Sequence, residues 1–462
     1  MIDSSLDRST APPPPKRALG IIFLIVFMDL LGFGVIIPQL PFYARTYHAS
    51  ALEVTVLFSI YSICQFAAAP ILGAISDRIG RRPVLVVSQI GSAIGYAMLG
   101  GVTQYEWANP AIGLWLIYVS RAIDGFSGGN ISTAQAYISD VTTSENRAKG
   151  MGVLGAAFGI GFAAGPALGG LLGSDGYEYL PAYVAALFSA IAAVLTFFLL
   201  PESRHAVRAR DVTLTTTTRE QDIATPMNAP GAIDPSALPG EKGQGTSTLV
   251  EKSQQRTLLD RTGILAAIRR PILLQLMLLS FFSMAAFVMM ESVIAIFLAD
   301  TFDWGSRNVG YFFAFIGVII AVVQGGLIGR LTRALGEWPL AILGPILVAV
   351  GMACFAQVGF SPWFALLLLG AATNATGRSL QQPTVSSLIS KFSDPREQGV
   401  VFGLYHGLSS VARVVGPIIA GMTYEKHRTA PFIVAGAVVV VVALWTVLLR
   451  IDVARRTVVV NR

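Results

Sequence analysis

The sequence predicts an all-α membrane protein in which twelve transmembrane helices form two pseudo-symmetric six-helix bundles. Hydrophobic residues make up 53% of the chain and charged residues only 13%, against roughly 25% charged residues in an average soluble domain. Apolar runs of about 20 residues recur along nearly the whole chain, and each could cross a hydrocarbon core of about 30 Å as a helix. Several motifs of the first half also return in the second half.

The apolar runs place the expected helices in order. Six fall in the first half, at 19–42, 52–75, 83–102, 112–138, 149–173 and 181–200. Six fall in the second half, at 272–299, 307–329, 338–358, 362–388, 398–421 and 430–449. The segment between the halves is rich in Thr, Pro, Gly and charge and has too little apolar content to fold alone. We therefore expect an N-terminal tail (1–18), a first bundle (19–202), a disordered linker (203–270), a second bundle (271–450) and a C-terminal tail (451–462).

The distribution of basic residues predicts the orientation. Most of the 33 Lys and Arg residues lie in the two tails, the linker and the loops on the same side. The opposite side carries Arg45, Arg307, Lys426 and Arg428. By the positive-inside rule, both termini and the linker are expected in the cytoplasm, and the chain in a bacterial inner membrane or a plasma membrane. Topology thus explains the basic excess, and nucleic acid is not an expected partner.

Two motifs of the first half recur in the second half. GAISDRIGRR (residues 73–82) closes the second run, and GGLIGRLTR (325–333) closes the eighth. GPALGG (165–170) in the fifth run is echoed by GPIIAG (416–421) in the eleventh. Internal duplication of this kind is typical of alternating-access transporters.

The loop at residues 73–82 resembles the signature cytoplasmic loop of the major facilitator superfamily, through the order Gly, Asp, Arg, Gly, Arg, Arg between two spans. The resemblance implies the fold of that family and a latch, in which acid and base hold the two halves in the outward-facing state. It also implies a further acid at the foot of the fourth span, so we expect Arg81 to pair with Asp140. The residues assigned to gating in this way are Gly73, Asp77, Arg78, Gly80, Arg81, Arg82, Asp140, Gly165, Pro166 and Gly169.

Longer stretches are similar to the tetracycline/proton antiporters of this superfamily. They are DLLGFGVIIPQLPFYA (29–44), GAISDRIGRRPVLVVS (73–88), the fourth and fifth runs from SRAIDG onward, and LPES (200–203). Gly165-Pro166 and Gly169-Gly170 in the fifth run resemble the antiporter signature of that span. The third run, however, has Gly95 where those exporters carry an aspartate, and the ninth run has no acid. A drug/proton antiporter for another small amphipathic compound therefore fits better than a tetracycline exporter.

Charges within the apolar runs are the candidates for proton coupling, because a charge that faces lipid at this depth is strongly penalised. Asp29 lies about 15 Å deep in the first run, near the midplane. Spans one and four line the same cavity in this fold, which places Arg121 within reach of Asp29. We expect Asp29, Arg121 and Glu291 to couple protons, with Asp29 as the leading carrier. The alternative to proton coupling is a static ion pair of Arg121, with Asp29 or with Asp124, that has only a structural role.

The expected substrate site draws on polar residues of both halves. The tenth run is the most polar of the second half, which suits the wall of a cavity. Glu291 could bind a cationic substrate or pair with an arginine of the other half, whereas we interpret His406 and Arg413 as a structural contact. The candidate substrate-binding residues are Gln39, Asp124, Asn130, Glu291, Asn374, Arg378 and Gln381.

These features predict a secondary active transporter that exports a small, drug-like amphipathic compound by alternating access. The proton gradient would drive it, without a cofactor or metal, and its partners would be the substrate, protons and the lipid bilayer around a monomer. The alternative is a proton-coupled or facilitative importer of a nutrient or metabolite. An enzyme is not expected, because the four histidines show neither metal-ligand spacing nor a Ser/His/Asp grouping.

Overall fold

The computed structural model describes residues 15–105, 107–128, 130–142, 147–173, 176–203, 270–394 and 398–460, and all regular structure within these ranges is helical. The helices of the first half are α1 (Pro15–Ile36), α2 (Leu40–Arg45), α3 (Ala51–Ile79), α4 (Arg81–Gln104), α5 (Pro110–Ser127), α6 (Asn130–Val141), α7 (Arg147–Leu172) and α8 (Leu180–Leu199). Those of the second half are α12 (Pro271–Phe302), α13 (Ser306–Val322), the π-helix η3 (Val323–Leu327), α14 (Ile328–Leu335), α15 (Glu337–Phe360), α16 (Phe364–Phe392), α17 (Gln398–Lys426) and α18 (Ala430–Val460). The predicted all-α fold is thereby confirmed.

Each predicted run coincides with one helix or with consecutive helices. The first run breaks between α1 and α2, where Pro38 cannot donate a backbone hydrogen bond and Pro41 stands in the first turn of α2. The fourth run divides at Gly128 into α5 and α6. At the chain ends, α1 begins within the predicted first tail and α18 continues through most of the last one. The predicted linker lies almost entirely outside the described residues.

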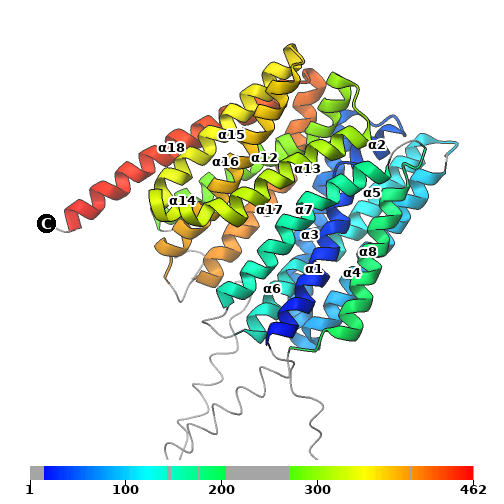
Figure 1. Cartoon of the computed structure of the whole chain (residues 1–462), viewed down its shortest axis with the longest axis horizontal. Coiled ribbons are helices and arrows are strands. Elements are labelled where there is room, and N and C mark those ends of the chain that lie inside the picture. Colours follow the sequence, from blue (N-terminus) through cyan, green and yellow to red (C-terminus); the bar gives the residue numbers. More distant parts are fainter. Residues whose placement is uncertain are drawn as a thin grey trace, which may run out of the picture.

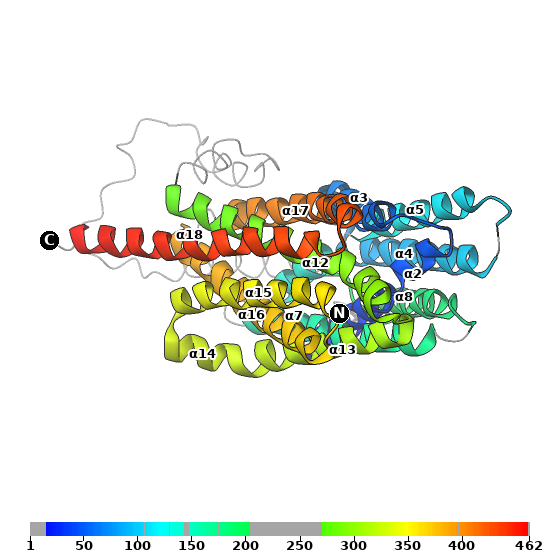
Figure 2. The ribbon, with the colours of Figure 1, turned by 90° about the horizontal axis from the view of Figure 1, so that it is seen from above.

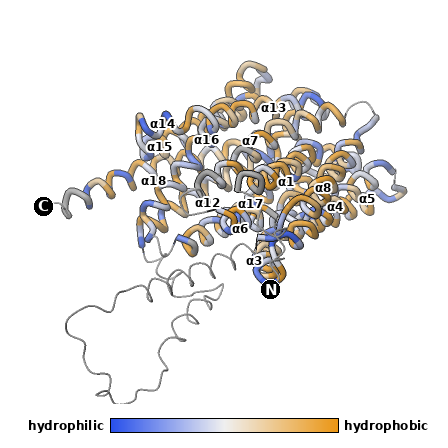
Figure 3. The backbone as a smooth tube through the Cα atoms, turned by 60° about the horizontal axis from the view of Figure 1, so that its bottom comes forward, coloured by the Kyte–Doolittle hydropathy of each residue, from blue (hydrophilic) through white to orange (hydrophobic). Residues whose placement is uncertain are grey.

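Among the described residues, nine helical segments are long and apolar enough to cross a membrane. The helices that do not meet both conditions are α2, α5, α6, α16 and α17. They include the helices that carry the arginines of the fourth, tenth and eleventh runs. Hydrophobic residues nevertheless cover most of the tube in Figure 3, and hydrophilic ones gather toward the helix ends. The number of twelve crossings stays a prediction.

The helices form two groups, α1–α8 and α12–α18, which lie side by side (Figures 1 and 2). Across the boundary, α3 packs along α17 and α7 packs along α13. The groups meet at the end that contains α2 and the first turn of α13, here called the joined end. They diverge toward the end where α6 and α14 lie, here called the splayed end (Figure 1).

Glycines determine how closely the helices approach each other. A Cβ atom on Gly310 of α13 would lie 2.5 Å from the Cα atom of Gly170 on α7, so no side chain fits between the two groups at the joined end. Within the first group, a Cβ atom on Gly165 would lie 2.7 Å from the Cα atom of Gly34 on α1. The small residues predicted in the fifth run therefore do bring backbones into contact.

The same boundary helices carry glycines at the splayed end that contact no neighbouring element. A Cβ atom on any of them would find no described atom within 4 Å outside its own helical turn. They are Gly152, Gly155 and Gly159 on α7, Gly325, Gly326 and Gly329 on η3 and α14, Gly73 on α3, and Gly403 and Gly407 on α17. The boundary is thus closely packed at one end and open at the other.

Candidate functional site

The first group buries an ion pair on α5. Arg121 Nη1 lies 3.1 Å from Asp124 Oδ2, and each residue is 2% exposed. The two residues are one helical turn apart and therefore share a face. The Arg121 guanidinium also lies 5.3 Å from the ring centroid of Tyr96 on α4. Its Nε and Nη2 atoms are buried and have no hydrogen-bond partner among the described residues.

Asp29 on α1 and Tyr61 on α3 belong to the same cluster. Asp29, Arg121 and Asp124 all lie within electrostatic range of the Tyr61 hydroxyl. The Tyr61 ring packs against Phe33 with 5.3 Å between the ring centroids, and Asp29 is half-buried. Four helices of the first group therefore bring two carboxylates, one guanidinium and tyrosine hydroxyls together. Of the two predicted ion pairs, the one between Arg121 and Asp124 is formed in the structure.

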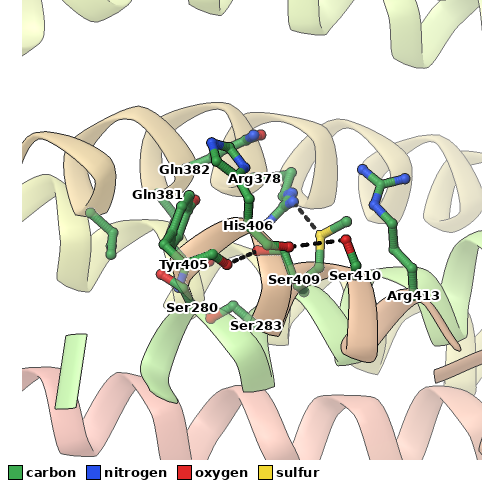
Figure 4. A pocket seen from close by; sticks show the side chains of 12 residues that line it. Ser280, Ser283, Arg378, Gln381, Gln382, Tyr405, His406, Ser409, Ser410 and Arg413 are labelled. Atoms are coloured by element: carbon green, nitrogen blue, oxygen red, sulfur yellow. Dashed lines mark hydrogen bonds between the residues drawn. The ribbon is translucent and has the colours of Figure 1, made fainter. Parts of the chain in front are cut away.

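The second group encloses a polar cavity of about 150 Å³ (Figure 4). Arg378 of α16 and Arg413 of α17 line it, and neither forms a salt bridge with a described carboxylate. Arg378 instead contacts the Met284 sulfur at 2.8 Å and lies 4.8 Å from the ring centroid of Phe287. No described acidic residue lines this cavity, whose other polar groups include Ser280, Ser283, Gln381, Gln382, Ser409 and Ser410.

A smaller cavity of about 50 Å³ lies between the two groups. Tyr61 and Arg121 line it from the first group, and Glu291 and Arg413 line it from the second. Glu291 forms no hydrogen bond or salt bridge with another described residue. Most of the remaining lining is apolar or aromatic and includes Phe33, Phe58, Phe162 and Val288. A compound in this cavity would touch charges of both groups together with aromatic rings.

Polar contacts connect the two groups at the joined end. Arg45 donates to both carboxylate oxygens of Asp300, at 2.6 and 3.0 Å. The Tyr424 hydroxyl donates to the same carboxylate at 2.7 Å. Gln39, a predicted substrate-binding residue, is 1% exposed and accepts a hydrogen bond from the Ser306 hydroxyl. The structure therefore places Gln39 in a contact between the groups.

The signature loop lies at the splayed end, between α3 and α4. Arg81 Nε donates to Asp140 Oδ2 at 3.1 Å, which confirms the pairing expected from the sequence. Asp77 forms a second ion pair with Arg81 at 2.5 Å. The Glu202 carboxylate accepts the backbone N–H groups of Arg81 and Arg82 at 2.9 and 3.1 Å. All of these described contacts are made inside the first group.

The predicted substrate-binding residues that line a cavity are Glu291, Arg378 and Gln381. Asn374 is 3% exposed and packs against Gly351 of α15, away from both linings. The side chain of Asn130 lies outside the described residues. Within the described ranges, no three His, Cys, Asp or Glu residues gather closely enough to hold a metal ion.

Sequence reasoning missed the tyrosines and serines of the site. Tyr61 and Tyr405 each line a cavity, and His406, interpreted as a structural residue, lines the larger one. Helical spacing could have indicated the serines, because Ser409 and Ser410 lie three and four residues after His406 and share its face. A search for polar residues on the faces of the charged ones would have found them.

Comparisons with known proteins agree on one family. The model of the Major Facilitator Superfamily matches residues 22–371 and 327–461. Tetracycline resistance protein, class C, of Escherichia coli is 28% identical over 419 residues, which cover 90% of this chain and 91% of that protein. Major facilitator superfamily domain-containing protein 10 of Homo sapiens is 28% identical over 442 residues, which cover 89% of this chain and 88% of that protein.

Solved structures share the fold. The crystal structure of the human organic anion transporter MFSD10 (TETRAN) is similar with a TM-score of 0.62 at 24% identity, over 94% of this chain and 100% of that chain. A mutant of the nucleoside transporter NupG is similar with a TM-score of 0.70 at 14% identity, over 94% of this chain and 99% of that chain. At these identities the structural similarity shows the fold alone.

Proposed function

This chain belongs to the major facilitator superfamily and is a membrane transporter, and from that premise we propose that it exports a small amphipathic compound in exchange for protons. The compound binds between the two groups of helices. The groups then open alternately at the joined and the splayed end, and the proton gradient drives the cycle.

The cavity between the groups is the observation that carries this proposal. It is lined by Arg121 and Glu291 from opposite groups and by several aromatic rings. Charges within a membrane-spanning bundle mark a transport path, because they are expensive there unless they meet water, a partner or a substrate. Aromatic and aliphatic walls beside them suit an amphipathic molecule.

The glycines of the boundary helices support alternating access. At the joined end Gly170 and Gly310 leave no room for a side chain, whereas Gly155 and Gly407 at the splayed end face open space. Closing the splayed end would give those glycines the close contacts that the joined end has now. On the orientation expected from the positive-inside rule, the present state is open to the cytoplasm, where an exporter loads its substrate.

Proton coupling in the proposal rests on Asp29, Arg121 and Glu291. Glu291 lines the cavity between the groups and has no described hydrogen-bond partner, so it is available to a ligand. A cationic group and a proton compete for such a carboxylate. Exchange requires such competition, because the transporter then changes conformation with either the substrate or a proton bound, but not with both.

The arginines favour a second candidate. Arg378 and Arg413 line a cavity with no acid among its described lining residues, and a guanidinium suits a carboxylate or sulfonate group. Human MFSD10 (TETRAN), whose solved structure shares the fold, is an organic anion transporter. An anion bound there would favour protonation of a nearby acid such as Glu291 instead of competing with it. The same fold would then carry an organic anion together with a proton, as an importer.

Transport into inside-out vesicles with an acidic interior separates the two candidates. The probes are fluorescein, an anion, and rhodamine, a cation with the same ring system. Proton exchange predicts accumulation of rhodamine that an uncoupler abolishes, whereas co-transport predicts that preloaded fluorescein leaves the vesicles faster. Absence of gradient-dependent movement of both dyes would contradict the proposal.

Asp29→Asn is the matched variant, since it removes the charge and keeps the side-chain size. We expect it to lose gradient-driven accumulation while it still exchanges labelled for unlabelled dye. The role of Asp29 is refuted if the variant couples transport to the gradient as well as the wild type does. Lys16→Gln, in the polar region before the first predicted span, serves as the charge-removing control.

A further inference from the structure

We propose that Glu337 and Lys391 are the counterpart, in the second group, of the Arg81–Asp140 pair, with the two charges exchanged, and that they position α16. This role of the pair is inferred from the described contacts. It does not depend on whether the protein imports or exports its substrate.

The two pairs occupy the same place in the two groups. Gly80 separates α3 from α4 with φ of 111°, and Gly336 separates α14 from α15 with φ of 80°, a region of φ that favours glycine. Each glycine N–H closes the preceding helix, to Ser76 O at 3.1 Å and to Thr332 O at 2.9 Å. The residue after each glycine is the first of the next helix: Arg81 in one group and Glu337 in the other.

Each of these first residues reaches the last turn of another helix. Arg81 meets Asp140 near the end of α6, in the sequence Ile-Ser-Asp. Glu337 Oε2 accepts from Lys391 Nζ at 2.7 Å near the end of α16, in the sequence Ile-Ser-Lys. Ser387, one turn before Lys391, donates to Glu337 Oε1 at 2.6 Å. The two pairs thus have the same arrangement, but the acidic and the basic residue have exchanged positions.

The helix dipoles explain why the first group needs an additional acid. A helix N-terminus favours an anion and a C-terminus favours a cation. Glu337 and Lys391 satisfy both preferences, whereas Arg81 and Asp140 satisfy neither. Glu202 compensates in the first group by accepting the two free N–H groups at the start of α4. Glu337 is itself the acid in the first turn of α15.

The pair anchors the part of α16 that lies beyond a proline. Pro383 removes one backbone hydrogen bond from this helix, between the cavity-lining Arg378 and the anchored Lys391. A hinge of this kind allows the two parts of α16 to move separately unless the end is held. The contact with Glu337 holds that end against α15, so it acts on the cavity from about 20 Å away along the helix.

Lys391 allows a test that does not unfold the protein. Its side chain is 64% exposed, against 12% for Glu337, so Lys391→Gln changes only the exposed member of the pair, and Glu337 keeps its hydrogen bond from Ser387. We expect hydrogen exchange in residues 384–394 to become about fivefold faster, the effect of one partly exposed ion pair. Lys391→Arg keeps the charge and should match the wild type.

Charge reversal provides the rescue experiment. Glu337→Lys combined with Lys391→Glu should restore most of the exchange protection lost in Lys391→Gln, although both charges then oppose the dipoles. Reversal of the first pair, by Arg81→Glu with Asp140→Lys, should fail, because residue 81 would repel both Glu202 and Asp77. Adding Glu202→Gln together with Asp77→Asn should rescue it.

Two results would overturn the inference. One is a hydrogen exchange rate in residues 384–394 of Lys391→Gln that equals the wild-type rate. The other is a charge-reversed Glu337–Lys391 variant in which these residues exchange as fast as in Lys391→Gln. For a dye that the wild type transports, KM should rise about fivefold in Lys391→Gln at unchanged thermal stability, and an unchanged KM refutes the positioning role. If neither dye is transported, the proposed function fails while hydrogen exchange still decides on the pair.

Discussion

The joined and splayed ends are built from the same helices but differ in what their glycines contact. At the joined end, Gly170 and Gly310 bring α7 and α13 backbone to backbone, and a Cβ atom on Gly421 of α17 would lie 2.7 Å from the Cα atom of Leu52 on α3. At the splayed end, glycines on the same helix pairs face no described neighbour within 4 Å. In this state the close glycine contacts between these helix pairs thus lie at the joined end.

The ion pairs, like the glycines, differ between the two ends. Arg45 and Asp300 connect the two groups at the joined end. At the splayed end, Arg81 pairs with Asp140 inside the first group, and Glu337 pairs with Lys391 inside the second. Each described ion pair at the splayed end therefore stays within one group, whereas the contact at the joined end must break before that end opens.

The largest effect is expected between the two ends, where Arg121→Ala would leave Asp124 buried without its partner. Breaking a buried pair in this way costs about 3–5 kcal/mol, and transport should be lost with it. Denaturant unfolding in detergent measures the change in stability. Arg121→Met with Asp124→Leu should regain much of the stability and none of the transport. An Arg121→Ala protein as stable as the wild type would show that the pair is solvated.

A side chain at the joined end should force the groups apart. Gly310→Val puts a Cβ atom 2.5 Å from the Gly170 Cα atom, and overpacking of this kind costs about 1–3 kcal/mol. Spin labels at Tyr177 and Trp363, exposed residues on either side of the boundary, should move farther apart. Gly305→Ala, where a Cβ atom meets nothing within 4 Å, is the control. An unchanged label distance in Gly310→Val would mean that the contact does not hold the end shut.

The reverse experiment places a side chain at the splayed end. Gly155→Leu has open space in this state, so stability should change by no more than about 0.5 kcal/mol. Transport should fall roughly tenfold, because closure of the splayed end would then be overpacked by about 1–3 kcal/mol. Ile160→Leu, exposed on the same helix, controls for the new side chain. Wild-type transport by Gly155→Leu would show that α7 does not approach its neighbour there.

The smallest effect is expected for the ion pair between the groups. The Arg45 and Asp300 side chains are 33% and 29% exposed, so water screens the pair and it contributes about 0.2–1 kcal/mol. Arg45→Ala should shift the equilibrium toward opening of the joined end by up to about fivefold, and less at high salt. The same spin-label distance reports it. Exchanging the two charges should restore the wild-type distribution.

Much of the fold could be predicted from the sequence, because long apolar runs determine where helices form and prolines determine where they break. The pairing of Arg81 with Asp140 was expected from the resemblance of the loop at residues 73–82 to the signature loop of the family. The partner of Arg121 was not, because Asp29 on a neighbouring helix and Asp124 one turn along satisfy the same requirement for a carboxylate at that depth. The rotation of α1 and α5 about their axes decides between them, and it is set by tertiary packing.

The positions of Gln39 and Asn374 could not be predicted for a related reason. A polar residue within an apolar run must avoid lipid, and it can do so in a cavity or in a contact between helices. Gln39 lies where the two groups join, and Asn374 lies between α15 and α16. Composition signals the burial of such residues but carries no information on which neighbour buries them. The serines of the larger cavity were missed because they share a helix face with charges instead of standing out in the sequence.

The close fit between α15 and α16 has a consequence for biogenesis. A Cβ atom on Gly377 of α16 would lie 2.5 Å from the carbonyl oxygen of Gly344 on α15, and one on Gly351 would lie 2.8 Å from that of Gly370. Because α16 carries Arg378 and is too polar to reside alone in lipid, it needs a companion as it leaves the translocon. The preceding apolar helix, α15, supplies one through these reciprocal glycines. The two helices are therefore suited to enter the bilayer as a hairpin, so that the polarity needed in the mature cavity is shielded during synthesis.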